Sequence, residues 1–510
     1  MRLATVAFLL ASLVSSLVCG CSSGSAPAQP DSGAPPSGDG GVDSGLISFT
    51  YTGAGCSYAV DPPTTRGYTD VALDDAVTSV DAATATPERV RLGLGGSTTA
   101  GQPGYPDLTT TAVLSWETSG ANHAAKARLG SSATALTDIH TGYAWTTPPP
   151  TIGIGNNEAA VNMHEVHVCG LKPATTYYYQ VGGGATGHEI WSATQSFTTL
   201  PSSGAIKVGV MGDARDTVTT WALVNQRMLM SGVSSILFSG DVIDIGTDES
   251  EYSQWLNAIW ETGVDGGAEG SPGGFGTLGQ LMFLPIAGNH ENEAVQFYSN
   301  FAIPGDGPYA KAFSSFNVGS AHVIMIDDQP IGTQPGGTET MAQLAWLEQD
   351  LAAANADRTN HPFIIAVSHR GLFSTSLHST DGDVLQTRAS LAPLYDKYKV
   401  DLVFNGHDHE YERSKPVNAA TPPSNPPIVV SGSTHGTTYV ICAGAGADPY
   451  QVGAGMPPYR AAYTQFGSGT PYIGVYGFLT IDATSLTYAA YGLKGAGGAD
   501  DMIDTFTLSN

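Results

Sequence analysis

Five apolar segments after residue 201 each end in a side chain that can bind a metal ion. They read as β-strands and lie at Ile206–Met211, Ser235–Phe238, Leu281–Ala287, Pro362–Val367 and Val400–Phe404. The polar residues that follow them, in order, are Asp213, Asp241, Asn289 with His290, His369, and His407 with His409. Ligands of α/β proteins gather beyond the carboxyl ends of the strands. One such ending is an ordinary turn, but five in order predict a single site.

The hydrophobic pattern changes near residue 201 and predicts a multidomain chain. Residues 202–510 alternate strands with helical stretches such as Val218–Met230, which indicates a layered α/β domain. Residues 87–201 hold short runs separated by turn residues, which indicates an all-β sandwich. These runs are Val90–Leu94, Ala112–Trp116, Glu165–Cys169, Thr176–Val181 and Thr194–Thr198. Residues 48–86 are predicted to be a β-rich lead-in segment.

Residues 168–179 form a strand, a Gly/Pro turn and a tyrosine-rich strand, which resembles the corner of a fibronectin type III fold. No group of metal-binding or nucleophilic side chains stands out between residues 87 and 201. We therefore expect a structural or partner-contacting module, with His164 and His167 on the surface of a strand.

The first residues resemble a bacterial lipoprotein signal. After Met1-Arg2, the apolar run Leu3–Val18 is too short to span a bilayer and fits a secretory signal over residues 1–20. Gly20 precedes Cys21, which predicts cleavage and lipid attachment there; an ordinary signal peptide is the alternative. Residues 21–47 are rich in Ser, Gly and Pro and read as a flexible tether. We expect an exported lipoprotein on the bacterial outer membrane or cell surface, attached to the membrane through Cys21 only.

Charge and cysteine content narrow the possible partners. The chain has 20 Lys and Arg against 46 Asp and Glu, a net charge of -26, so we expect no nucleic-acid partner. An anionic substrate would need a concentrated positive charge such as bound metal. The chain has no CxxC pair, so we do not expect a zinc site built from thiolates. One disulfide is possible after export, with Cys56–Cys169 as the expected pair. The oligomeric state is left open.

The residue types explain the expected chemistry. A carboxylate can bridge two metal ions, while imidazole and amide ligands complete the coordination spheres without adding negative charge. A hydroxide held between the ions can attack phosphorus, while both ions neutralise the phosphate oxygens.

The same motifs resemble those of metallophosphoesterases, and within that group the purple acid phosphatases. The resemblance rests on the strand endings above, on the stretch HEVHVCGLKPATTYYY, on the helix WLEQDL and on LAPLYDKYKVDLVFNGHDHEYER, and it spans about residues 87–510. It implies a four-layer catalytic sandwich behind the fibronectin III-like domain.

By resemblance, Asp213 and His409 bind one metal ion, Asn289, His369 and His407 bind the second, and Asp241 bridges the two. His290 would protonate the leaving oxygen as a general acid, and His378, nine residues after His369, would face the phosphate. We expect Glu291 and Asp408 to orient ligands or cap turns.

Two positions depart from the family pattern. Asp244 stands where purple acid phosphatases carry the tyrosine that gives their colour, and Arg215 stands where the broader family often has a histidine. Either Asp244 coordinates the first ion, or Arg215 and Asp244 form an ion pair at the rim while Arg215 also contacts substrate phosphate. We favour the ion pair. The protein should then not be purple, and Fe, Mn and Zn are all plausible metals.

Three functions follow from these features. The leading hypothesis is an extracytoplasmic hydrolase of phosphate monoesters acting on a small phosphate-ester substrate. The alternatives are a phosphodiesterase of the same fold and a non-catalytic anchored binding protein.

Overall fold

The computed structural model describes residues 49–53, 56–60, 69–73, 86–96, 107–120, 123–146, 162–185, 187–260, 276–304, 311–450, 456–495 and 498–510. These belong to one compact unit, Gly45–Asn510. The predicted signal, the tether and Cys21 lie outside the described residues, so those predictions stay open. Among the helices that are described, none combines the length and the apolar character needed to cross a bilayer.

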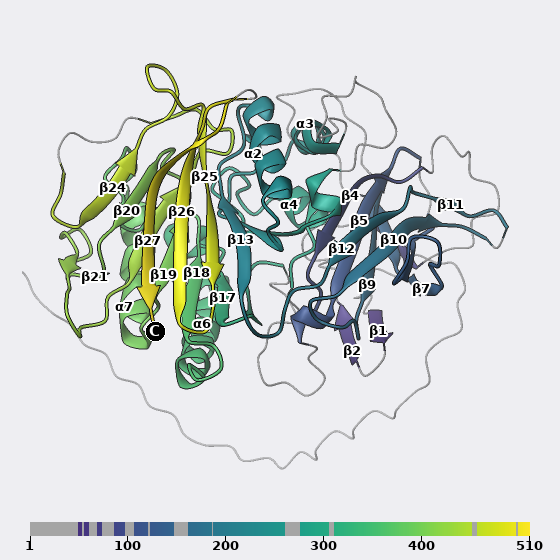
Figure 1. Cartoon of the computed structure of the whole chain (residues 1–510), viewed down its shortest axis with the longest axis horizontal. Coiled ribbons are helices and arrows are strands. Elements are labelled where there is room, and N and C mark those ends of the chain that lie inside the picture. The colour runs from purple at the N-terminus through teal and green to yellow at the C-terminus, as the bar shows by residue number, and fades with distance from the viewer. Residues whose placement is uncertain are drawn as a thin grey trace, which may run out of the picture. The chain divides into compact units, whose positions relative to one another are not determined.

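The first part of the chain is built from antiparallel strands (Figure 1). One sheet has the spatial order β3 (Thr69–Leu73), β8 (Tyr143–Thr146), β9 (Asn162–Val168), β5 (Ala112–Thr118) and β4 (Glu88–Gly93). The second contains β11 (Ile190–Trp191), β10 (Thr176–Gly183), β6 (Lys126–Gly130) and β7 (Asp138–Thr141), with β12 (Gln195–Thr198) also paired to β10. A hairpin of β1 (Phe49–Gly53) and β2 (Cys56–Val60) precedes them. The identification with a fibronectin type III domain stays a prediction.

Strand β9 corrects one expectation. His164 and His167 are buried, not on a strand surface. The reason is that β9 lies between β8 and β5 in the sheet, and its side chains are buried on both faces from Met163 to Val168. The His164 ring stacks on Trp116 with centroids 5.1 Å apart, and His167 Nε2 lies 2.7 Å from Glu165 Oε1.

The second part of the chain contains two large mixed sheets. The first has the order β15 (Met282–Pro285), β14 (Ser235–Phe238), β13 (Ile206–Met211), β25 (Gly474–Ile481), β26 (Ser485–Leu493) and β27 (Asp501–Ser509). The second has the order β16 (Ser314–Val318), β17 (Ala321–Met325), β18 (Phe363–Val367), β19 (Leu402–Asn405), β23 (Thr438–Cys442), β20 (Tyr411–Ser414) and β24 (Arg460–Thr464). A short ladder joins β21 (Val417–Asn418) and β22 (Ile428–Val429).

The helices cover the outer faces of these sheets. They are α2 (Val218–Met230), α3 (Glu249–Trp260), α4 (Val295–Asn300), α5 (Gln329–Thr333), α6 (Thr338–Ala356) and α7 (Gly382–Tyr398), with short 3-10 turns η2 (Leu108–Thr110) and η3 (Thr277–Gly279). Residues of α2 to α4 share a core with one face of the six-stranded sheet. Residues of α5 to α7 share another with one face of the seven-stranded sheet.

The inner faces of the two sheets meet in a third core. Val208 and Val210 of β13 share it with Ile365 and Val367 of β18. Successive side chains of a strand point to opposite faces, so the alternate residues Ile364 and Ala366 of β18 lie in the core on the helix side. Such a central strand is apolar on both faces. The order helices, sheet, sheet, helices is the mixed α/β sandwich that the resemblance implied.

Parallel pairing explains why the strand endings converge. β13, β14 and β15 run parallel, as do β17, β18, β19 and β23. Their carboxyl ends therefore reach the same edge of each sheet. The predicted segment Leu281–Ala287 is shortened to β15, Met282–Pro285, and the N–H of Ile286 beyond it still donates to the carbonyl of Phe238.

The β-rich part packs on the α/β part through the third core, which also contains Val166 and Phe197, and through polar contacts. Lys311 Nζ lies 3.2 Å from Glu165 Oε2, and the Tyr179 hydroxyl donates to the carbonyl of Gly279. Cys169 is disulfide-bonded, while its pairing with Cys56 stays a prediction. Cys442 is a free buried thiol, and burial raises its pKa to about 12.

Candidate active site

The loops after the parallel strands bend sharply where they carry the predicted ligands. Asp213, Asp241 and His407 have φ of 58°, 55° and 72°, the left-handed region that non-glycine residues rarely adopt. A Cβ at Gly288 would collide with the Asp241 carboxylate, and one at Gly406 with that of Asp213. Glycines at these positions let the backbone pass close to the two carboxylates.

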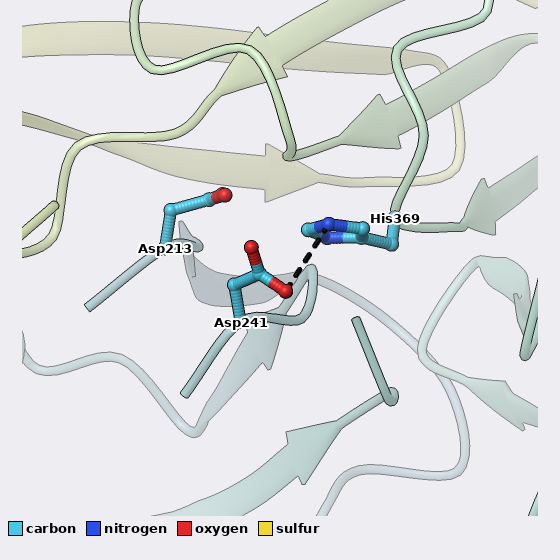
Figure 2. Close-up of side chains that lie close together, drawn as sticks. All are labelled: Asp213, Asp241 and His369. Carbon is cyan, nitrogen blue, oxygen red and sulfur yellow. Dashed lines mark ion pairs between the residues drawn. The ribbon is translucent and has the colours of Figure 1, made fainter. Parts of the chain in front are cut away.

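Asp213, Asp241 and His369 form the centre of the site. One ligand atom from each lies within 4.8 Å of the others, and all three side chains are buried. In Figure 2 the two carboxylates and the imidazole are turned towards one another, and the dashed line joins His369 to Asp241. The distance from His369 Nε2 to Asp241 Oδ1 is 3.3 Å.

Backbone carbonyls fix the tautomers of two histidines. His369 Nδ1 lies 2.8 Å from the carbonyl of Ser239, and His409 Nδ1 lies 2.5 Å from that of Asp448. Since a carbonyl only accepts, each Nδ1 carries the proton and each Nε2 of the neutral ring keeps its lone pair. His409 Nε2 lies 3.5 Å from Asp213 Oδ1 and makes no hydrogen bond. Such outer contacts orient imidazoles that bind metal.

Asn289 and His407 complete the set. Asn289 Oδ1 lies 2.9 Å from His369 Nε2 and 2.7 Å from His407 Nδ1. With His369 Nε2 as a lone pair, the first of these contacts joins two acceptors. A cation between the two atoms would turn this repulsion into coordination.

The charges of the site also fit bound metal. The pKa of Asp213 is raised well above its usual range by burial and by the neighbouring Asp241. Burial raises the pKa of Asp241, but the neighbouring His369 and His290, the backbone N–H of His290 and the charge of Arg215 outweigh it, so that the net pKa is lowered. Burial lowers the pKa of His409 to about 3 and that of His407 well below its usual range, so both rings are neutral. Asp213 Oδ2 has no partner. Two close buried carboxylates with neutral imidazoles are a donor set suited to divalent cations.

Glu291 and Asp408 hold the loops. The Glu291 carboxylate accepts hydrogen bonds from the backbone N–H groups of Gly288, Asp241, Val242 and Ile243, at 2.6 to 3.3 Å. It thus fixes the loops that present Asp241 and Asn289. Asp408 Oδ1 accepts from the backbone N–H of His378. The contacts of Glu291 fit an orienting role, while an orienting role of Asp408 stays a prediction.

Arg215, Asp244 and His290 lie together at the margin of the cluster. Arg215 Nη1 is 2.8 Å from Asp244 Oδ1 and 2.5 Å from His290 Nε2. His290 Nδ1 lies 2.7 Å from the carbonyl of Asp244, and its Nε2 lies 3.9 Å from Asp241 Oδ2. The ion pair between Arg215 and Asp244 is one of the two arrangements expected, while coordination by Asp244 stays a prediction.

His378 and Tyr450 form a further wall of the site. His378 Nδ1 pairs with Asp381 Oδ2 at 2.8 Å, and its ring lies 4.4 Å from that of His407. The Tyr450 ring stacks on His409, with centroids 3.9 Å apart. Sequence reasoning missed Tyr450. The missed signal was the strand β23, which is parallel to β19, so that the glycine-rich loop after it also reaches this edge.

Comparison with known proteins identifies the family. Residues 134–411, more than half of the chain, match the model of the calcineurin-like phosphoesterases. The chain belongs to this family. Membership supports a hydrolase and implies divalent metal ions.

Curated relatives place the chain near the purple acid phosphatases. An uncharacterized protein of Mycobacterium tuberculosis is 26% identical over 422 residues, covering 69% of this chain and 76% of the relative. Purple acid phosphatase 15 of Arabidopsis thaliana is 28% identical over 309 residues, 56% of this chain and 55% of the relative. The aligned region therefore spans about half of this plant phosphatase.

Solved structures agree on the fold. The purple acid phosphatase PPD1 from yellow lupin seeds matches with a TM-score of 0.64 at 18% identity, over 83% of this chain and 74% of that one. The structure of PhoD matches with a TM-score of 0.55 at 12% identity, over 84% of this chain and 91% of that one. Both share the mixed α/β sandwich.

Proposed function

We propose that this calcineurin-like phosphoesterase hydrolyses phosphate monoesters outside the cytoplasm with two metal ions bound. The observation that carries the proposal is a cluster of six side chains, five of them buried, in which each lies close to at least one other. They are those of Asp213, Asp241, Asn289, His369, His407 and His409. Asp213 and His409 would hold one ion, Asn289, His369 and His407 the other, and Asp241 would bridge them. Fe, Mn and Zn all suit these ligands.

When bound, the two ions would neutralise the phosphate and acidify the attacking water. His290 would give the leaving oxygen its proton. Its side chain is 27% exposed, at the mouth of the site, where a leaving group can depart. His378 would contact the phosphate from the opposite loop. It is held by Asp381 at Nδ1, which keeps Nε2 for substrate.

Two further properties belong to the proposal. The substrate is a small phosphate ester and not a nucleic acid, because the net charge of -26 opposes a polyanion. A lipid on Cys21 attaches the protein to the outer membrane or cell surface. Membrane fractionation tests this: Cys21→Ser should release the protein, and continued sedimentation with membranes would contradict the anchor.

The decisive test combines metal analysis with turnover of an Asp241→Asn variant. Asparagine keeps the shape but loses the bridging charge, so we expect bound metal to fall from about two equivalents and phosphate release from 4-nitrophenyl phosphate to drop about 100-fold or more. Asp138→Asn, at a carboxylate that is 63% exposed, is the matched control and should leave both values unchanged.

Three outcomes would count against the proposal. Full turnover by Asp241→Asn would refute the bridging role. Faster cleavage of diesters than of monoesters by the wild type would indicate a phosphodiesterase. Stoichiometric metal without turnover of either substrate would favour a binding protein.

A further inference from the structure

The guanidinium of Arg215 is a cation held beside the proposed metal ligands. Its side chain is only 10% exposed. Nη1 contacts His290 Nε2, which lies 3.9 Å from Asp241 Oδ2. The group therefore sits at the margin of the proposed metal centre, within the reach of a phosphate bound there.

The hydrogen bonding of Arg215 is incomplete. A guanidinium has five N–H donors. Nη1 serves Asp244 and His290, and Nη2 makes one long contact of 3.3 Å to the Tyr450 hydroxyl. Nε is buried and makes no hydrogen bond, the nearest carboxylate oxygen being that of Asp216 at 3.6 Å. Buried donors without acceptors are costly, so the site is built for an additional anion.

Asp244 is the partner that an anion can replace. Its side chain is 49% exposed, so water can solvate the carboxylate when it gives up its contacts with Arg215 and, at 3.2 Å, with His290 Nδ1. Tyr450 and His290, in contrast, are fixed. Tyr450 stacks on His409, and the His290 ring is held at Nδ1 by the carbonyl of Asp244. They keep the guanidinium in place when the carboxylate leaves.

We propose that Arg215 binds a charged, unsubstituted oxygen of the substrate phosphoryl group in place of Asp244, and that this contact selects monoesters over diesters. This inference rests on the proposed function. A fully ionised monoester offers two negative charges and no second ester group. A diester offers one charge and carries a substituent where a monoester has a free oxygen. Planar bidentate recognition of phosphate favours arginine over lysine at this position.

Arg215→Gln and Asp244→Asn should change phosphate recognition in opposite directions. In metal-loaded Arg215→Gln we expect kcat/KM for 4-nitrophenyl phosphate to fall about 10- to 100-fold, with less than about a threefold fall for bis(4-nitrophenyl) phosphate. The Kd of inorganic phosphate, measured by calorimetry, should rise about tenfold or more. Asp244→Asn removes the competing anion, so its phosphate Kd should fall. Arg215→Lys should recover part of the affinity if the loss is one of charge.

Arg227→Gln is the matched control. Arg227 lies in the last turn of α2 and pairs with Asp500 at 2.7 Å, outside the cluster. It should alter neither the substrate ratio nor phosphate binding. Metal content and melting temperature of each variant show that the site is intact.

Two results would overturn the inference. One is an equal loss on both substrates in Arg215→Gln, and the other is an unchanged phosphate Kd in that variant. If the wild type hydrolyses neither ester but Arg215→Gln still weakens phosphate binding, the anion contact stands and the hydrolase proposal fails. If the wild type hydrolyses esters and Arg215→Gln has the same kcat/KM and the same phosphate Kd, the hydrolase proposal stands and the anion contact fails.

Discussion

At the scale of single residues, the hydrogen bonds of His290 bear directly on its role. Nδ1 lies 2.7 Å from the carbonyl of Asp244, and Nη1 of Arg215 lies 2.5 Å from Nε2. A proton donor for a leaving group must carry its proton at the nitrogen that faces the substrate. Because the backbone holds Nδ1, Nε2 is the nitrogen that we expect to serve the leaving group.

Replacement of His290 should show this role through the leaving group. In His290→Ala we expect kcat to fall about 100-fold or more for alkyl phosphates, whose leaving groups need a proton, and much less for 4-nitrophenyl phosphate. The slope of log kcat against leaving-group pKa should steepen. A uniform loss across the series would mean that His290 positions substrate without donating a proton. Bound metal should not change, because His290 is not among the proposed ligands.

The residues of the site differ in how far the sequence could foretell them. Asp213 and Asp241 follow apolar runs that pair in parallel within one sheet, whereas His369 joins them because the second sheet packs on the first. For Glu291 the sequence leaves open whether it orients ligands or caps turns, because its backbone contacts depend on how two loops meet. Tyr450 lies in the glycine-rich loop after β23, and its stacking on His409 depends on the path of that loop, which the end of β23 alone does not define.

At the scale of elements, burial decided which boundaries could be predicted. β13, β14 and α2 have the predicted bounds, since apolar runs bounded by turn residues mark central strands and covering helices. β9 was misread, because alternating polar residues suggest an exposed face. His164 is buried by stacking on Trp116 of the neighbouring strand β5, whereas His167 pairs with Glu165 of β9 itself.

The start of helix α3 carries a buried acid that should make stability depend on pH. Glu249 Oε1 accepts from Asn300, while Oε2 has no partner. Burial and the charge of Glu117 raise the pKa of Glu249 from 4.5 to about 8. The folded state thus binds the proton more tightly than the unfolded state. The stabilisation is complete below about pH 4.5 and is lost as the pH rises to about 8.

Glu249→Gln removes this titration. Compared with wild type, its free energy of unfolding should be similar at pH 5 and higher by a few kcal/mol at pH 8, at about 1.4 kcal/mol per unit of pKa shift. Urea unfolding at the two pH values measures the difference. Glu348→Gln, on the exposed side of α6, is the control and should show no change between pH 5 and 8, since the pKa of Glu348 is lowered by Lys397. An equal gain at both pH values would contradict the assignment to Glu249.

At the scale of the whole molecule, the β-rich part and the α/β part share one hydrophobic core. Val166 and Phe197 of the first part belong to the same cluster as Val208 and Phe316 of the second. This shared core gives the β-rich part a structural role beside the site, and sequence periodicity could not reveal it because it joins strands distant in the chain. Buried polar contacts across the boundary add orientation to this packing.

Lys311 makes the clearest of these contacts. Its side chain is 6% exposed, and Nζ lies 3.2 Å from Glu165 Oε2 and 3.0 Å from the carbonyl of Tyr298. Burial raises the pKa of Glu165, but the charge of Lys311 and the contact with His167 outweigh it, and the net pKa is lowered. This pair therefore stabilises the fold above the usual carboxyl range, and the contribution is lost as the pH falls.

Lys311→Met should destabilise the protein without emptying the metal site. Loss of one partner leaves a buried carboxylate with less compensation, which costs about 3–5 kcal/mol of unfolding free energy at pH 7. Adding Glu165→Gln should recover part of that loss, because the stranded charge disappears. Lys397→Met breaks an exposed pair and should cost less than about 1 kcal/mol. Metal content and kcat of folded Lys311→Met should match wild type, since Lys311 contacts none of the proposed ligands. A stability loss no larger than that of Lys397→Met would mean that the shared hydrophobic core alone joins the two parts.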